Sequence, residues 1–197
     1  MPALANEADS RQLFGRETYQ FSDLKALTKW TGALERYFAE KGVAEGSCEE
    51  NFLTRCHLQE WIRFLHGLRG KDRWIQIEAV NRYLNAVPYL EDPINYGVPE
   101  YWATPSEHLS RQGDCEDYAI AKFLSLRELG FADKDLRVAV VQDLNLRVLH
   151  AVLVVYDGDQ PYILDSQTRY VLPAFAILHY QPIYAVNEAH GWLYRPF

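Results

Sequence analysis

The sequence has no run of about 18 or more apolar residues, so no part of it is expected to span a membrane as a helix. It also lacks an excess of basic residues, because 20 Lys and Arg against 27 Asp and Glu give a net charge of −7. Since phosphate binding needs a basic face, nucleic acid is not the expected partner. No charged segment followed by an apolar one is present, so an intact signal peptide is not expected either.

The chain has no Gly- or Ser-rich linker, no internal repeat and no low-complexity tract. Its 197 residues, 48% of them hydrophobic and 14% aromatic, are enough to bury a sizeable core, so residues 1–197 are expected to form a single domain. Ala3-Leu4-Ala5 matches the small-x-small form of a signal cleavage site. We therefore expect residues 1–15 to be a flexible N-terminal segment that remains after a signal peptide has been removed.

Cysteine is scarce, and three cysteines leave at least one thiol unpaired in a single chain. Cys48 and Cys56 are close in sequence and could form a disulfide in an oxidising compartment, or they could be two ordinary thiols. Cys115 differs from both, because a glycine and three acidic residues surround it.

The N-terminal half has the apolar periodicity of helices. The pattern predicts three of them: Leu24–Phe38, with Ser22 as N-cap and Gly42 as the stop; Phe52–Leu65, which includes Cys56 and Ile62 and has Trp61 along its flank; and Ile77–Leu84, closed by Pro88.

Two further helices are predicted around Cys115. Thr104–Glu107 has the form of a capping box with Pro105 at the first helical position, which indicates a short helix. The apolar residues of Cys115–Leu129 indicate a longer one, with Gly130 as its C′ residue.

Beyond Gly130 the pattern changes to short segments rich in β-branched residues. The predicted strands are Leu136–Val141, Val148–Tyr156 and Tyr162–Asp165, with Asp157–Asp159 as a turn and further strands at Ile183–Val186 and Trp192–Tyr194. Helices followed by an antiparallel meander are typical of an α+β fold.

Cys115 has the surroundings of a nucleophile. It is at the expected start of a helix, where unpaired N–H groups and the positive end of the helix dipole favour thiolate over thiol. The same N–H groups could form part of an oxyanion hole. The neighbouring carboxylates oppose a thiolate, so their charge must be neutralised or directed away. A buried structural thiol is the alternative interpretation of Cys115.

The acids around Cys115 also have a structural interpretation. Asp is among the most favourable N-cap residues, which would explain Asp114. Glu116 and Asp117 would lie in the first turn, where acidic residues are favourable. Helix capping therefore accounts for all three acids as well as a functional role does.

His150 is the candidate base among six histidines, because it stands alone in the β-branched segment Val148–Val154. Asp165 ends the next predicted strand, so a hairpin would bring its carboxylate alongside the imidazole to orient it. Asp143, at the end of the preceding strand, is the alternative orienting residue. A partly buried structural residue is the alternative for His150.

Four segments resemble the bacterial transglutaminase-like cysteine proteinases. Gly113–Ala119 (GDCEDYA) is similar to the nucleophile motif of that family. The segments Tyr101–Pro105 (YWATP), Leu149–Ala151 (LHA) and Ile163–Asp165 (ILD) match the same family in order. The resemblance covers roughly residues 10–190.

The resemblance implies an α+β fold with a papain-like or transglutaminase-like core, in which N-terminal helices precede an antiparallel sheet. It also implies a catalytic triad of Cys115, His150 and Asp165. The expected activity is that of a cysteine endopeptidase.

Activity in this family depends on calcium bound by the acids around the nucleophile. The resemblance therefore implicates Asp114 and Glu116 as calcium ligands, with Asp117 as a further candidate. Calcium prefers carboxylate and carbonyl oxygens, and a bound cation would make the acids tolerable beside a thiolate.

The resemblance also implies a location and partners. Periplasmic proteases of this family cleave a large surface adhesin near its N-terminus, after a pair of alanines, and thereby release cells from a biofilm. The periplasmic domain of an inner-membrane receptor for cyclic di-GMP sequesters and inhibits them. The expected protein is thus a calcium-dependent periplasmic endopeptidase.

Two other functions stay open. The same triad could transfer an acyl group to an amine, as a transglutaminase does. A non-catalytic binding module could keep the fold, although such a module has no need of Cys, His and Asp together. The aromatic loop Tyr96–Trp102 is a candidate substrate-side surface, and Trp102 is equally well explained as a core residue.

Overall fold

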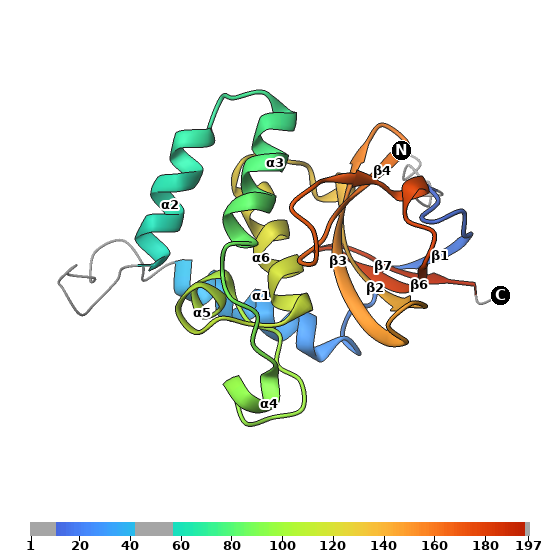
Figure 1. The fold of residues 1–197 in the computed structure, drawn as a ribbon, viewed down its shortest axis with the longest axis horizontal. Helices are drawn as coiled ribbons and strands as arrows, with labels where there is room; N and C mark the ends of the chain where they lie inside the picture. Colours follow the sequence, from blue (N-terminus) through green and yellow to red (C-terminus); the bar gives the residue numbers. More distant parts are fainter. Residues whose placement is uncertain (1–10, 42–56, 196–197) are drawn as a thin grey trace, which may run out of the picture.

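The computed structural model describes residues 11–41 and 57–195. Figure 1 shows two layers, with the helices on one side and the sheet on the other. This α+β arrangement, helices first and an antiparallel sheet afterwards, confirms the expected fold class. In the described part of the chain, no helix is both long and apolar enough to cross a membrane.

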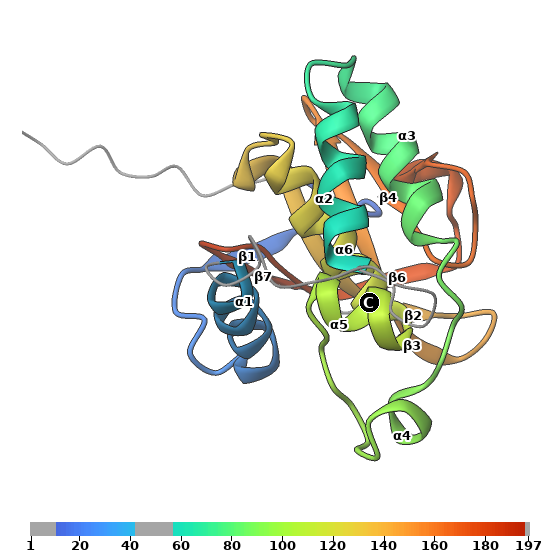
Figure 2. The same cartoon turned by 90° about the vertical axis from the view of Figure 1, so that its left-hand side faces the viewer.

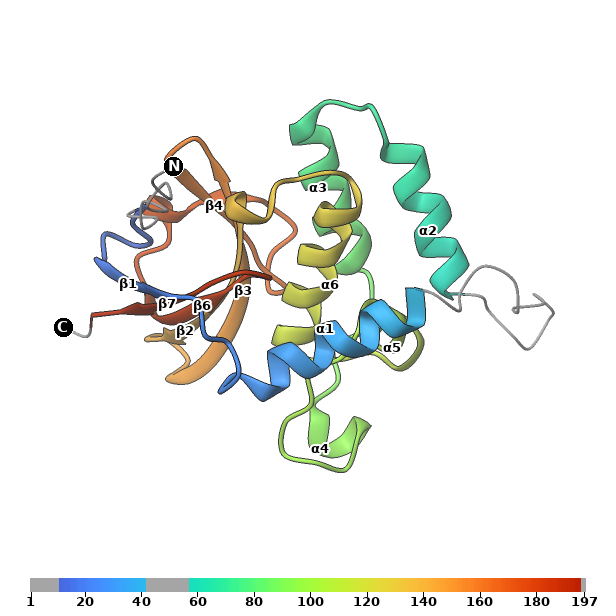
Figure 3. The same ribbon diagram turned by 180° about the vertical axis from the view of Figure 1, so that it is seen from behind.

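The helices precede most of the strands in the chain. Their bounds are α1 (Thr28–Lys41), α2 (His57–Leu68), α3 (Arg73–Leu84), α4 (Asp92–Asn95), α5 (Pro105–Arg111) and α6 (Cys115–Glu128), with short 3₁₀ turns η1 (Asp133–Asp135) and η2 (Ala174–Ala176). Helix α6 is buried nearly all round, because it lies between the sheet and the other helices (Figure 3). The loop that carries α4 projects from the end of the helical layer (Figure 2).

Over the described residues, seven strands form one antiparallel sheet in the order β1-β7-β6-β2-β3-β4-β5. The strands are β1 (Thr18–Phe21), β2 (Leu136–Asp143), β3 (Val148–Asp157), β4 (Gln160–Leu164), β5 (Leu172–Pro173), β6 (Tyr180–Val186) and β7 (Gly191–Tyr194). The predicted C-terminal strands are confirmed. The pattern did not predict β1 or β5, which are short edge strands.

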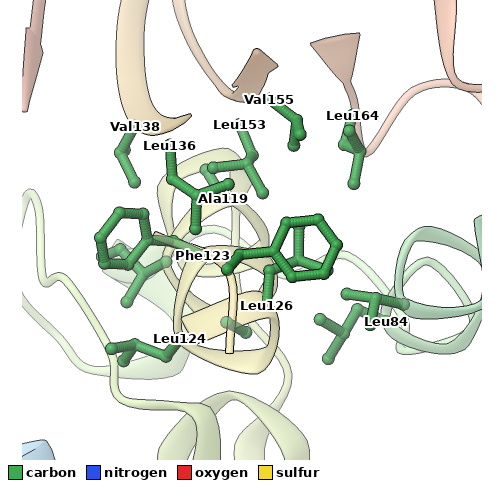
Figure 4. Close-up of a cluster of buried hydrophobic side chains, with 14 of the residues drawn as sticks. Leu84, Ala119, Phe123, Leu124, Leu126, Leu136, Val138, Leu153, Val155 and Leu164 are labelled. Atoms are coloured by element: carbon green, nitrogen blue, oxygen red, sulfur yellow. The ribbon is translucent and has the colours of Figure 1, made fainter. Parts of the chain in front are cut away.

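Each face of the sheet carries an apolar cluster. Phe123 and Leu126 of α6 pack against Leu153 and Leu164 on one face (Figure 4). Trp192 and Leu13 belong to the cluster on the other face, and Leu13 is fully buried. Residues 11–15 of the expected N-terminal segment thus include a core residue, whereas residues 1–10 lie outside the described residues.

The first two helices differ from the prediction. Helix α1 begins at Thr28 rather than after Ser22, because Leu24 lies in a turn, with its carbonyl accepting from Leu27 N–H at 2.9 Å. Phe38 is 54% exposed, since packing buries the α1 face that carries Trp30 instead.

In α2, Trp61 belongs to the buried face and not to the flank, because its indole donates to Ser125 Oγ of α6 at 2.8 Å. The predicted stop at Gly42, the start of the second helix around Phe52, and the cysteines Cys48 and Cys56 lie outside the described residues.

The local signals around Cys115 are confirmed. The Thr104–Glu107 capping box forms at the start of α5. Helix α6 starts at Cys115 and is followed by Gly130, whose φ of 92° favours glycine. Helix α3 ends at Leu84, before Pro88 as expected.

Candidate active site

Gly113 determines how closely the segment before Cys115 can pack. A Cβ at this position would lie 2.2 Å from Asp117 Oδ2 and 2.8 Å from His108 Nδ1, so a side chain does not fit. The carbonyl of Gly113 accepts a hydrogen bond from Leu90 N–H at 2.9 Å. The glycine thus allows Asp117 and His108 to pack closely against the segment just before Cys115, the first residue of α6.

His150 and Asp165 are hydrogen bonded, with 2.9 Å between His150 Nε2 and Asp165 Oδ1. The β3–β4 hairpin explains this contact, because Leu153 pairs with Leu164 and Asp165 follows directly at the end of β4. Both side chains are buried. Burial alone would raise the pKa of Asp165, but the hydrogen bond and charge of His150 lower it below its ordinary value, which keeps the carboxylate ionised.

Tyr180 and Asn85 hold Asp165 in place, and sequence patterns did not single out either residue. Tyr180 donates its hydroxyl to Asp165 Oδ2 at 2.7 Å. The Asn85 amide donates to the backbone carbonyls of Asp165 and Thr168, each at 2.8 Å. These contacts come from β6 and from the end of α3, which are distant in sequence from Asp165, so no local pattern marks them.

Asp143, the alternative orienting residue, forms hydrogen bonds with backbone groups of the turn that follows it. Its Oδ1 accepts from the N–H groups of Asn145 at 2.8 Å and Leu146 at 3.0 Å. This geometry caps the β2–β3 turn. Asp165 is therefore the carboxylate that contacts His150.

The sulfur of Cys115 lies at β3, against the residue that follows His150. The backbone N–H of Ala151 is hydrogen bonded to it, at a point of β3 that extends past the end of β4. Because Nε2 of His150 is used by Asp165, Nδ1 is the ring nitrogen left for a thiol. The thiol itself donates to Glu116 Oε2 at 3.2 Å, rather than to His150.

The pKa of the Cys115 thiol is raised well above its ordinary value. Burial is the largest cause, followed by the charge and hydrogen bond of Glu116 and the charge of Asp114. The acids therefore oppose the thiolate, as expected from the sequence.

Three aspartates form a cluster next to Cys115. Carboxylate oxygens of Asp92, Asp114 and Asp117 lie within 4.8 Å of one another, and Asp114 also lies within this distance of Cys115 and Glu116. Burial and the neighbouring carboxylates raise the pKa of Asp114 to about 9. Burial raises the pKa of Asp117 to about 8, and the charges of Asp114 and Asp92 act in the same direction. The hydrogen bond from Ala103 N–H acts in the opposite direction.

The cluster contains carboxylate oxygens without partners. Asp92 Oδ1 and Asp114 Oδ1 are buried and have no hydrogen-bond partner among the described residues. Asp114 is the N-cap residue of α6 and forms a capping box with Asp117, whose Oδ2 accepts from Asp114 N–H at 3.3 Å. Buried oxygens of this kind suit a hard divalent cation such as Ca²⁺.

Asp92 was not among the predicted metal ligands. It is at the start of α4, where its carboxylate accepts from Tyr101 N–H. An acid beside a proline in a loop looks like an ordinary helix start, so nothing in the local sequence distinguishes it. Only the contact between the α4 loop and the start of α6 brings it to Asp114.

Trp102, for which the sequence allowed a substrate-side or a core position, is a core residue. Trp102 is 4% exposed, and its ring meets that of Trp30 edge to face at 6.4 Å. Packing thus decides between the two interpretations of Trp102.

Of the other candidate histidines, His57 and His66 are on α2, and His108 is fully buried on α5.

The family profile described as bacterial transglutaminase-like cysteine proteinase BTLCP matches residues 43–191, so this chain belongs to that family of cysteine proteinases. Among solved structures, it is similar to LapG of Legionella pneumophila. The calcium-bound LapG structure has 32% sequence identity and a TM-score of 0.69, with 80% of this chain and 87% of LapG covered.

The EGTA-treated LapG structure gives a TM-score of 0.70 at the same 32% identity, with 81% of this chain and 86% of LapG covered. No curated protein sequence matches the chain.

Proposed function

We propose that this chain is a calcium-dependent cysteine endopeptidase in which Cys115 is the nucleophile, His150 the general base and Asp165 the residue that orients the imidazole. The observation that carries the proposal is the buried 2.9 Å hydrogen bond between His150 and Asp165, next to a cysteine at a helix start. Membership of a cysteine proteinase family supports it.

The proposed reaction proceeds in two stages. His150 accepts the thiol proton, and the Cys115 sulfur attacks the scissile carbonyl carbon, whose π electrons move to the oxygen. The tetrahedral intermediate collapses to a thioester while the imidazolium protonates the leaving amine. Water, deprotonated by His150, then attacks the thioester, and the thiol is regenerated when the acid product leaves.

Asp92, Asp114 and Asp117 are the residues proposed to hold calcium, with Glu116 as a further ligand. When bound, Ca²⁺ supplies the positive charge that offsets these carboxylates beside the thiolate. The two unpartnered oxygens of the cluster and the similarity to LapG, which is solved in a calcium-bound form, support this assignment.

The proposed substrate is the N-terminal region of a large surface adhesin, cleaved in the periplasm after a pair of alanines. The proposed inhibitor is the periplasmic domain of an inner-membrane receptor for cyclic di-GMP. Both proposals rest on the family resemblance and on the 32% identity to LapG over most of both chains.

The function is tested by incubating the protein with an adhesin N-terminal fragment and mapping the products by mass spectrometry. We expect a single cut after the alanine pair in the presence of calcium. A fluorescent primary amine in the same reaction tests the acyltransferase alternative. Incorporation of the amine without release of a peptide would contradict the proposed hydrolysis, and an intact fragment with no labelling of Cys115 by a peptide aldehyde would indicate a binding module.

The orienting role of Asp165 is tested with a matched pair of variants. Asp165→Asn is expected to leave the protein folded but to lower kcat about 10³- to 10⁴-fold, because an amide favours the wrong imidazole tautomer. Asp143→Asn is expected to change kcat little, since Asp143 caps a turn. Cleavage rates and thermal unfolding of both variants decide the question. If Asp143→Asn is the inactive one, the assignment of Asp165 is wrong.

A further inference from the structure

Tyr89 is attached to the nucleophile segment through its backbone. It forms an isolated parallel bridge with Gly113, two residues before Cys115, and the adjacent Leu90 N–H donates to the Gly113 carbonyl at 2.9 Å. The position of Tyr89 therefore depends on the same segment that places the sulfur.

The ring of Tyr89 packs against a residue of α6. It stacks on the ring of Tyr118 with centroids 6.3 Å apart and an interplanar angle of 14°. Tyr118 lies three residues after Cys115, is buried, and donates its hydroxyl to the carbonyl of Val87. The Tyr89 ring thus rests on a fixed surface at the first turn of the nucleophile helix.

The phenol of Tyr89 is an available hydrogen-bond donor. Its O–H has no hydrogen-bond partner among the described residues, and the side chain is 56% exposed. Partial burial, followed by the charges of Cys115, Asp114 and Glu116, raises the pKa of Tyr89. The bridge to Gly113 and the stacking on Tyr118 place this phenol at the start of α6, on the segment that carries Cys115.

A cysteine endopeptidase needs a second donor for the oxyanion besides the backbone N–H at the start of α6. We propose that the Tyr89 hydroxyl, held against Gly113 and stacked on Tyr118, donates a hydrogen bond to the substrate carbonyl oxygen at Cys115. This inference rests on the proposed function of the same site.

The hydrogen bond acts while the tetrahedral intermediate forms and is released when it collapses. As the sulfur–carbon bond forms, the π electrons of the carbonyl move to its oxygen, which accepts from the Tyr89 O–H and from the N–H of Cys115. When the intermediate collapses, the electrons return to the carbonyl and the amine leaves with the proton from His150. Tyr89 keeps its own proton throughout.

Tyr89→Phe is the test, because it removes the hydroxyl and keeps the stacked ring. We expect kcat for cleavage of the adhesin fragment to fall about 100-fold with little change in KM, the order of loss for one oxyanion donor. Alkylation of Cys115 by iodoacetamide needs the thiolate but no oxyanion, so its rate is expected to stay unchanged. Tyr19→Phe, on the exposed edge strand β1, is the matched control.

The outcomes separate this inference from the proposed function. If the wild type cleaves and Tyr89→Phe cleaves at the same rate, the inference is wrong and the proposed function stands. A fall in the alkylation rate equal to the fall in kcat would assign Tyr89 to the positioning of the sulfur, which also contradicts the inference. A wild type that cleaves no fragment would overturn both.

Discussion

Cys115→Ala is expected to abolish cleavage of the adhesin fragment while the protein stays folded. Removing the nucleophile of a triad costs roughly 10⁵-fold or more in kcat, because no other group in the site can form the acyl intermediate. His150→Ala is expected to be equally damaging, since the two residues act as a unit. Cys115→Ser is expected to be inactive as well, because an alcohol is a weaker nucleophile in a site built for a thiol.

The fold is expected to tolerate the Cys115→Ala change. The substitution removes one sulfur atom and its hydrogen bond to Glu116 from the first residue of α6, a residue that is partly exposed. Initial cleavage rates and the midpoint of thermal unfolding are the measurements. His66→Ala on the exposed side of α2 is the control, and it should keep full activity. Substantial turnover by Cys115→Ala would refute the proposed triad.

Chelation with EGTA is expected to abolish activity, and calcium is expected to restore it. The titratable atoms of Asp114, Cys115 and Glu116 lie within 4.8 Å of one another. At an effective dielectric constant near 20, an ionised carboxylate and a thiolate at this distance repel each other by about 3 kcal/mol. A helix terminus contributes about 1 kcal/mol in the opposite sense, so the acids outweigh it unless a cation offsets them.

Magnesium is expected to restore activity less well than calcium, because its octahedral, water-rich shell suits a rigid cluster of carboxylates poorly. Asp92→Asn, Asp114→Ala and Glu116→Ala should each lose calcium binding and activity together. Glu78→Gln on the exposed face of α3 is the control. Isothermal titration with calcium and cleavage rates in EGTA are the measurements. Full activity after exhaustive chelation would leave the acids with a capping role alone.

The chelated protein should also show a defined pH dependence of stability. Asp114 and Asp117 have pKa values raised to about 9 and about 8, from the ordinary value of 3.8 in the unfolded chain. Because both pKa values are raised, the contribution of these two carboxyl groups to the free energy of unfolding is fully present below about pH 4. This contribution is lost as the pH rises to about 9. Calcium binds the ionised form, so the increase in Tm on adding calcium should grow with pH. A pH-independent increase would contradict calcium binding by these carboxylates.

The local sequence was sufficient for those elements whose signals lie within a few residues. The Thr104–Glu107 capping box, the helix that starts at Cys115 and ends before Gly130, and the strand that carries His150 depend on local features. These are caps, glycine at positive φ and β-branched residues. The pairing of His150 with Asp165 follows from the same information, because a short turn leaves a hairpin as the simple connection between the two strands.

The apolar pattern of the sequence was insufficient where a helix has more than one face that could be buried. The apolar residues around α1 allow more than one buried stripe, and the contacts of Trp30 with Trp102 and Phe123 decide which stripe is buried. Phe38 is left exposed as a result. The choice depends on neighbours far along the chain, which helical periodicity does not encode.

The tertiary structure alone decided the surroundings of the proposed triad. Asp92 reaches Asp114 across the α4 loop, Tyr180 reaches Asp165 from β6, and Tyr89 rests on Tyr118. Each is a single polar or aromatic side chain in a segment with no distinctive pattern. The physical reason is that a ligand set or a hydrogen-bonded support depends on distance in space, whereas a sequence pattern reports only the conformation of its own segment.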